Sequence, residues 1–143
     1  MIWIAPQTVP SATFEQLDFR DFTAEPATYD VVTSYFAMLV ALSQKQIRET
    51  LRNICHWFKS GGLLIFSTVP DDYEHFEHTW LSRKAISSSL SVEQFTTLLA
   101  ELGMYIKYSH VHNFNSKTAE VGLCRAREDN EEPQLFLYAR KAA

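Results

Sequence analysis

Apolar residues along the chain fall into short continuous runs and two segments with helical spacing. Residues 31–42 begin with β-branched side chains and are apolar on both faces, which is typical of a strand covered by helices on each side. Residues 12–17 alternate around Phe14 and Leu17 before a polar turn, which indicates a short strand ending in a loop. The pattern predicts strands at residues 12–17, 31–42, 63–69, 104–114 and 133–139.

Two helices are predicted between these strands, and each begins with a capping box. Ser43 with Gln46 forms the first box, and Ser91 with Gln94 forms the second, because in each a serine precedes a glutamine by three residues. Apolar side chains then recur at helical spacing in both segments. The glycines that follow supply the C-terminal stops, Gly61 and Gly103. Helices that alternate with buried strands predict an α/β fold.

Length and charge limit the classes of function. With 143 residues, the chain suffices for one domain, residues 1–143, that buries roughly 70% of its unfolded surface. A net charge of −4 without a dense run of Lys or Arg argues against nucleic-acid and anionic-membrane binding. Cys55 and Cys124 fit neither a disulfide framework nor a metal spacing. No targeting segment or membrane-spanning run is visible, so we expect a cytoplasmic protein.

Two motifs carry a family resemblance. Tyr29-Asp-Val-Val-Thr-Ser-Tyr-Phe-Ala-Met-Leu39 precedes the first helix, and Phe58-Lys-Ser-Gly-Gly62 follows it and leads into Leu-Leu-Ile-Phe-Ser67. This order resembles the later half of a class I S-adenosylmethionine (SAM)-dependent methyltransferase, with Ser60 where the family has proline. The resemblance covers nearly the whole chain, and the family's first two strands and first helix are absent from it. It implies a truncated Rossmann-like fold: a mostly parallel sheet with an antiparallel C-terminal strand beside the fifth, and helices on the faces.

The resemblance also implies a reduced cofactor site. The family holds SAM with a glycine-rich turn and an acidic residue, and none of the four glycines of this chain is placed to form that turn. Asp18 with Phe19 stands at the family's adenine position, and Ser34 with Tyr35 ends the strand that flanks the methionine moiety. The alternatives are that Asp18 is a turn residue accepting backbone hydrogen bonds and that Tyr35 is a half-buried core aromatic. We expect no cofactor on the chain alone.

The richest candidate site is the insertion at residues 71–80. In open α/β sheets ligands bind beyond the carboxyl ends of the strands, where this insertion begins. Its groups that move protons near neutral pH include Glu74 and Glu77, and the candidates for catalysis are His75, His78, Tyr73 and Asp72. The candidates for substrate binding are Tyr35, Phe36, Trp80 and Arg83. The alternative is a polar surface loop or outer hairpin whose histidines face water. Two histidines three residues apart are too weak a signal to predict a metal site.

A second pair of histidines lies on a later strand. His110 and His112 share one face of the strand at residues 108–114 by its two-residue period. The resemblance places this strand at the edge of the sheet, away from the cofactor cleft. Solvent-facing histidines are therefore favoured over an acid–base pair.

Three hypotheses about function follow. The first is a SAM-independent enzyme that binds a small organic molecule and catalyses an isomerisation, cyclisation or elimination. The second is a noncatalytic partner that stabilises a full-length methyltransferase. The third is a SAM-dependent methyltransferase completed by another chain. We favour the first, because the helix caps and the core periodicity are intact.

A homodimer is also expected from the resemblance. In the family the strand at residues 29–37 is central, and the family's first strand pairs along one of its edges. Without that strand the edge exposes unpaired amide and carbonyl groups. A second copy related by a two-fold axis covers such an edge, and the interface would bury on the order of 2,000 Å².

Overall fold

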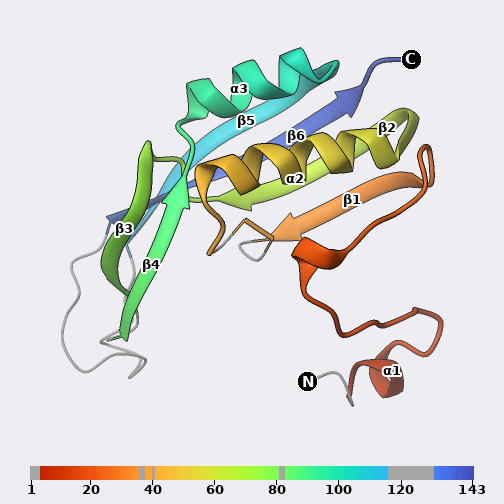
Figure 1. The fold of residues 1–143 in the computed structure, drawn as a ribbon, viewed down its shortest axis with the longest axis horizontal. Coiled ribbons are helices and arrows are strands. Elements are labelled where there is room, and N and C mark those ends of the chain that lie inside the picture. The colour runs from red at the N-terminus through yellow and green to blue at the C-terminus, as the bar shows by residue number, and fades with distance from the viewer. Residues whose placement is uncertain (1–3, 36–37, 40, 81–82, 116–130) are drawn as a thin grey trace.

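The main sheet has four strands with the C-terminal strand in its interior. The computed structural model in Figure 1 describes residues 4–35, 38–39, 41–80, 83–115 and 131–143. The sheet order is β1-β2-β6-β5, with bounds β1 (Tyr29–Tyr35), β2 (Phe58–Thr68), β5 (Met104–Asn115) and β6 (Glu131–Lys141). β1 is parallel to β2, whereas β6 is antiparallel to β2 and to β5. The predicted sheet, mostly parallel with one antiparallel C-terminal strand, is confirmed.

Both long helices begin where the capping boxes predict. Helix α2 (Gln44–Trp57) is capped by Ser43 and helix α3 (Val92–Glu101) by Ser91. Each serine hydroxyl accepts the amide of the glutamine three residues on, and that glutamine side chain accepts the serine amide. Two shorter elements precede the sheet, the helix α1 (Ala5–Thr8) and the 3-10 turn η1 (Phe19–Asp21). None of the described helices is long and apolar enough to span a membrane.

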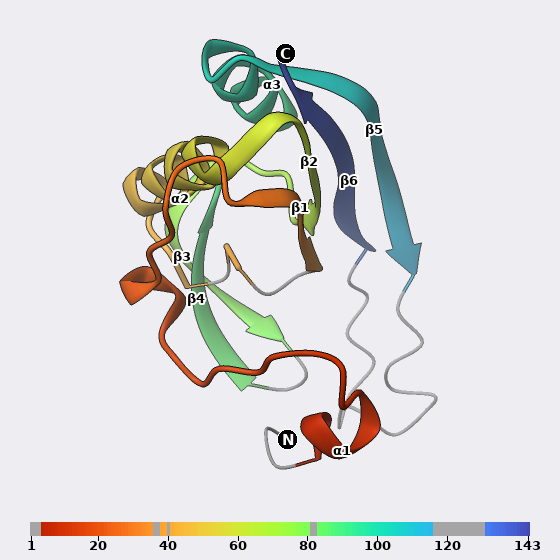
Figure 2. The same cartoon turned by 90° about the vertical axis from the view of Figure 1, so that its right-hand side faces the viewer.

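Helices α2 and α3 lie on the same side of the sheet, and no helix of the described chain covers the other side (Figure 2). The hydrophobic core fills the space between these helices and the sheet. Its fully buried side chains include Ile47, Leu51, Ile54, Leu64, Phe66, Phe95, Leu98 and Leu137. Along β1 the residues of the uncovered side are exposed, and Val31 retains 46% and Tyr35 61% of its surface.

Three predictions about these elements are wrong. Residues 12–17 form no strand, because no described strand lies beside them, and Phe14 and Leu17 each stay 39% exposed. The strand predicted at residues 31–42 ends at Tyr35 and is not covered on both faces. Beyond it, Leu39 is buried from a turn and Leu42 from the loop before α2, so these apolar residues serve the core without extending the strand.

The third wrong prediction concerns Gly61, which does not stop the first helix. Helix α2 ends at Trp57, and Phe58 already has extended backbone. Gly61 instead lies within β2, with a positive φ of 74° that favours glycine. A Cβ on the neighbouring Gly62 would lie 2.8 Å from the Phe58 ring, so the chain folds back closely on itself here. Gly103, by contrast, follows α3 with a φ of 72°, as predicted for a helix stop.

Candidate acid–base site

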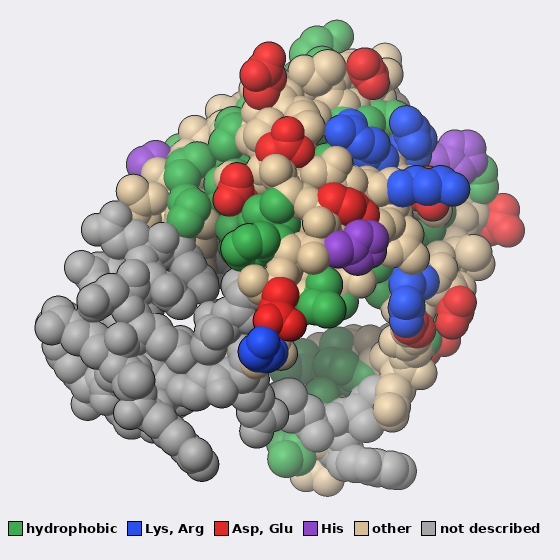
Figure 3. All heavy atoms as spheres, turned by 60° about the vertical axis from the view of Figure 1, so that its left-hand side comes forward, with side chains coloured by type: hydrophobic (Ala, Val, Ile, Leu, Met, Phe, Trp, Pro, Cys, Tyr) green, Lys and Arg blue, Asp and Glu red, His purple; other side chains and the backbone are tan. Residues whose placement is uncertain are grey.

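The insertion at residues 71–80 begins a β-hairpin. Strands β3 (Tyr73–Trp80) and β4 (Arg83–Ser89) pair antiparallel and form a separate two-stranded sheet. The hairpin stands at the end of α2 where that helix begins (Figure 1). On this side of the molecule, Figure 3 shows hydrophobic side chains among acidic ones and a hollow with hydrophobic side chains inside it.

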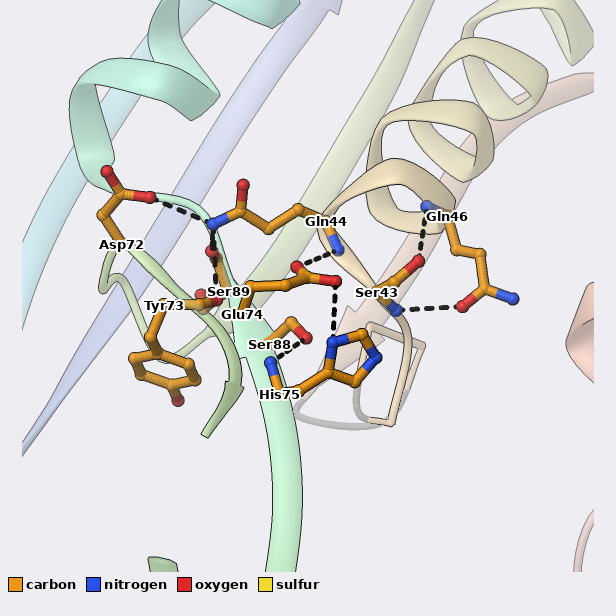
Figure 4. A network of polar contacts seen from close by, with 9 residues as sticks. All are labelled: Ser43, Gln44, Gln46, Asp72, Tyr73, Glu74, His75, Ser88 and Ser89. Atoms are coloured by element: carbon orange, nitrogen blue, oxygen red, sulfur yellow. Dashed lines mark hydrogen bonds and ion pairs between the residues drawn. The ribbon is translucent and has the colours of Figure 1, made fainter. Parts of the chain in front are cut away.

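Gln44, the first residue of α2, fastens the hairpin to the helix (Figure 4). Its side-chain Nε2 lies 3.0 Å from Asp72 Oδ1, 2.9 Å from the Ser89 carbonyl oxygen and 3.3 Å from the Tyr73 carbonyl oxygen. Two of these acceptors lie at the start of β3, and the third lies at the end of β4. The amide of one glutamine therefore fixes where the hairpin sits relative to α2.

Glu74 connects the helix N-terminus to His75. Glu74 Oε2 accepts the backbone amide of Gln44 at 2.8 Å, a position where the helix dipole favours negative charge. The other carboxylate oxygen, Oε1, lies 3.2 Å from His75 Nδ1. Figure 4 shows the carboxylate between the first turn of α2 and the imidazole ring. This arrangement holds the ring by one nitrogen.

The backbone of His75 has an unusual conformation. Its φ is +51°, a left-handed value that is uncommon for residues other than glycine. The pairing of β3 with β4 shifts register between Tyr73 and Phe76, so His75 lies at a β-bulge. The His75 amide donates to Ser88 Oγ at 3.0 Å. Bulges redirect side chains, and strained backbone persists where the surrounding contacts fix it.

Two of the other predicted catalytic residues, Asp72 and Tyr73, take part in the same hairpin network as His75. Asp72 accepts a hydrogen bond from the Gln44 side chain, and the Tyr73 hydroxyl lies 3.3 Å from Ser87 Oγ. His78, Trp80 and Arg83 belong to the hairpin strands, but their side chains lie outside the described residues, as does all of Phe36. The sequence predicts Glu74 as one of the proton-moving groups of the insertion but not as a catalytic residue, although its carboxylate is the group that contacts the His75 ring.

Tyr35 is not among the residues that the network brings together. Val32 and Ser34 of β1 are partly buried toward the helices, and Tyr35 alternates with them. The Tyr35 side chain therefore lies on the face of the sheet that no described helix covers, where it is 61% exposed. It is neither part of the hairpin site nor a half-buried core residue. Ser34 Oγ accepts the amide of Met38 at 3.1 Å.

Asp18 and Phe19 make contacts within the chain. Asp18 Oδ1 accepts the backbone amide and Nε of Arg20, each at 2.9 Å, and Asp18 Oδ2 also accepts from the Arg20 guanidinium. These hydrogen bonds lower the pKa of the Asp18 carboxyl to about 2. Asp18 is thus a turn residue that accepts a backbone hydrogen bond. Phe19 stacks on Phe22 and meets the edge of Trp57, with ring centroids 6.1 and 6.5 Å apart.

Asp18 and Phe19, at the position where the resemblance places adenine, already have partners within the chain. In the described chain no glycine-rich turn joins a strand to a helix, since Gly61 and Gly62 lie in β2 and Gly103 follows α3. The carboxylate of Asp18 is engaged by Arg20, and the ring of Phe19 is packed against other aromatic rings. Among the described residues there is also no group of three or more His, Cys, Asp or Glu side chains that could hold a metal ion.

His110 and His112 lie on β5 at the edge of the sheet, as predicted. Both are exposed, and their ring centroids are 6.2 Å apart. These histidines belong to the four-stranded sheet and not to the hairpin, so they do not contribute to the Glu74–His75 pair.

Solved structures of similar fold are found over nearly the whole chain. A SAM-dependent methyltransferase from Methanosarcina mazei has a TM-score of 0.69 at 12% identity, covering 99% of this chain and 77% of that one. One from Mesorhizobium loti has a TM-score of 0.65 at 19% identity, with coverage of 99% and 76%. The [4+2]-cyclase SpnF has a TM-score of 0.66 at 14% identity, with coverage of 99% and 62%.

Sequence comparison adds no relative to these structures. No protein-family model matches the sequence, and no curated protein matches it. The sheet order, with its antiparallel C-terminal strand in the interior, and the structural matches agree with the two sequence motifs. The chain has the fold of the class I SAM-dependent methyltransferases.

Proposed function

We propose that the chain is an enzyme that acts on a small organic molecule by general acid–base catalysis, independently of SAM. The observation that carries this proposal is the pair of Glu74 and His75, joined at 3.2 Å and anchored to the first amide of α2. The proposed reaction is an isomerisation, cyclisation or elimination.

The chemistry follows from the way the imidazole is held. A carboxylate at Nδ1 keeps the proton on that nitrogen, so Nε2 carries the lone pair that accepts a proton. No described residue hydrogen-bonds to Nε2, and the His75 side chain is 70% exposed, so a substrate reaches it. His75 takes a proton from the substrate, Glu74 stabilises the imidazolium, and the same proton returns to another substrate atom in an isomerisation. No oxidant or further reactant is needed.

Two observations support a reaction other than methyl transfer. The carboxylate of Asp18, at the position where the family contacts adenine, is held by Arg20. SpnF has a similar fold and is named a [4+2]-cyclase, so a reaction without methyl transfer has a precedent on this fold.

A second candidate is a noncatalytic partner of a full-length methyltransferase. It is favoured by the edge of β1, which has a hydrogen-bonded neighbour on one side only in the described chain. A SAM-dependent activity completed by another chain is a variant of this candidate. Both predict a hetero-complex that purifies under mild conditions, which the acid–base proposal does not require.

The acid–base proposal is tested with a probe for a positioned base, because the substrate is not identified. The probe is 5-nitrobenzisoxazole, whose ring opens when a base removes one proton. We expect His75→Gln to lower kcat/KM about 100-fold, at the low end of general-base contributions. Glu74→Gln should give a smaller loss, because the imidazolium that forms during the reaction loses its carboxylate. His110→Gln, which removes another exposed histidine, is the control and should keep the full rate.

Two results would overturn the proposal. One is an unchanged rate in both His75→Gln and Glu74→Gln. The other is stoichiometric binding of SAM in calorimetry by the purified chain, which would return the function to methyl transfer. We expect no heat beyond dilution in that titration.

A further inference from the structure

Strand β1 is an edge strand, and its residues 31–35 carry none of the features that usually prevent pairing. In the part of the chain that the structure describes, it is hydrogen-bonded to β2 alone. It contains no Lys, Arg or Pro, and its one acidic residue, Asp30, forms an ion pair with Lys59 at 2.7 Å. Val31 and Tyr35 are 46% and 61% exposed. Exposed apolar edges of this kind are templates for another strand.

The other edge of the sheet differs. Strand β5 carries Lys107, and its pairing with β6 shifts register between Ile106 and Tyr108. A charged residue and a bulge are devices by which edge strands avoid pairing. Of the two edges, β1 is the one without a Lys, so the pairing is assigned to β1.

We propose that β1 pairs antiparallel with β1 of a second copy, about a two-fold axis at Thr33. A two-fold axis perpendicular to the sheet leaves each face on its own side, so residues that oppose each other must come from the same face. This restricts the axis to the position of a residue. The axis at Thr33 places Thr33 opposite itself and Tyr35 opposite Val31 of the second copy.

The local structure of β1 selects this register. Its pairing with β2 shifts between Tyr29 and Val31, so regular strand geometry spans residues 31–35, and Thr33 is the centre of that range. The axis at Thr33 matches the two large exposed apolar residues of the strand with each other. Aromatic side chains opposite β-branched ones, and threonine opposite threonine, are favourable cross-strand pairs.

A second copy is favoured over other occupants by closure. Pairing β1 with β5 of the next molecule would leave a free edge at each end and would build a filament. Pairing β1 with β1 uses both open edges at once and ends there. The result is one continuous sheet in which the uncovered faces of both copies lie on the same side.

The oligomeric state of the full chain is measured first, by sedimentation equilibrium and light scattering. We expect a dimer at micromolar concentration. Val31→Lys and Tyr35→Lys should each raise the dimer Kd about ten-fold or more, since each places a charge opposite an apolar side chain. Tyr105→Lys is the matched control, because Tyr105 is also 61% exposed but lies on β5, and its Kd should not change. Circular dichroism checks that each variant is folded.

Cysteine cross-linking tests the register in a chain with Cys124→Ser. Thr33→Cys should form a disulfide-linked dimer under mild oxidation, because the two residues at the axis oppose each other. Val32→Cys should not, since residues one step off the axis lie about 8 Å apart and disulfides need less than about 7 Å between Cα atoms. A wild-type monomer, or dissociation by Tyr105→Lys alone, overturns the interface. Cross-linking through Val32→Cys in place of Thr33→Cys overturns the register.

Discussion

The rings of Phe66 on β2 and Phe95 on α3 pack at a centroid distance of 5.5 Å and an interplanar angle of 57°. Both side chains are fully buried, and their contact joins α3 to the interior strand β2 of the sheet. Phe95→Ala should lower the free energy of unfolding by about 3–5 kcal/mol, because a large cavity remains. Urea denaturation measures this loss. Phe76→Ala removes a ring that is 54% exposed and should cost about 1 kcal/mol or less.

The two capping boxes make a second prediction. Ser43→Ala and Ser91→Ala should each destabilise the protein by about 1 kcal/mol, because each leaves helix amides without an acceptor. The caps belong to different helices, so the double variant should lose about the sum of the two. Ser43→Asp and Ser91→Asp retain an acceptor and serve as controls in the same denaturation series. A loss from the aspartate variants as large as from alanine would show that the caps do not act through this hydrogen bond.

Removal of the Gln44 side chain should loosen the hairpin. Gln44→Ala deletes the donor that joins Asp72, Tyr73 and Ser89 to α2. Amide hydrogen exchange should become faster in β3 and β4 and stay unchanged in β2 and β6. Lys45→Ala, at the next position and with a side chain 84% exposed, should leave the exchange pattern intact. Equal protection of the hairpin in Gln44→Ala would contradict this anchoring role.

Cys55 predicts a loss of stability at alkaline pH. Burial raises the pKa of its thiol to about 11, whereas a cysteine in an unfolded chain has a pKa of about 8.5. Between these values the unfolded chain has lost the proton and the folded chain has kept it. The free energy of unfolding should therefore fall by about 1.4 kcal/mol per pH unit from this residue, and the contribution is fully present below about pH 8.5. Urea denaturation of Cys55→Ala should lack this slope.

Local signals in the sequence predicted the elements that depend on local interactions. Ser43 and Ser91 begin their helices as predicted, since a capping box involves residues three positions apart. The strand predicted around Phe14 and Leu17 failed because a strand requires a neighbour, and alternation does not reveal whether one exists. Gly61 was assigned to the wrong element because a positive φ suits both a helix stop and a tight path within a strand.

The candidate site was predicted in part for the same reason. Asp72, Tyr73 and His75 are neighbours in sequence, and the structure places them in one network. The role of Glu74 depends on the amide of Gln44, which is 30 residues away. No local pattern indicates that contact. Tyr35 was grouped with the hairpin because both follow strand ends, but the alternation along β1 turns its side chain to the other side of the sheet.

The interior position of β6 has a consequence for how the chain is made. Strand β6 is the last described strand to leave the ribosome, yet it separates β2 from β5 and pairs with both. Until residue 141 has been synthesised, β2 and β5 have no common neighbour, and Leu64 and Phe66 lack part of the layer that buries them. The sheet therefore closes only after translation of this strand, and a nascent chain that stalls earlier exposes apolar surface to chaperones and to aggregation.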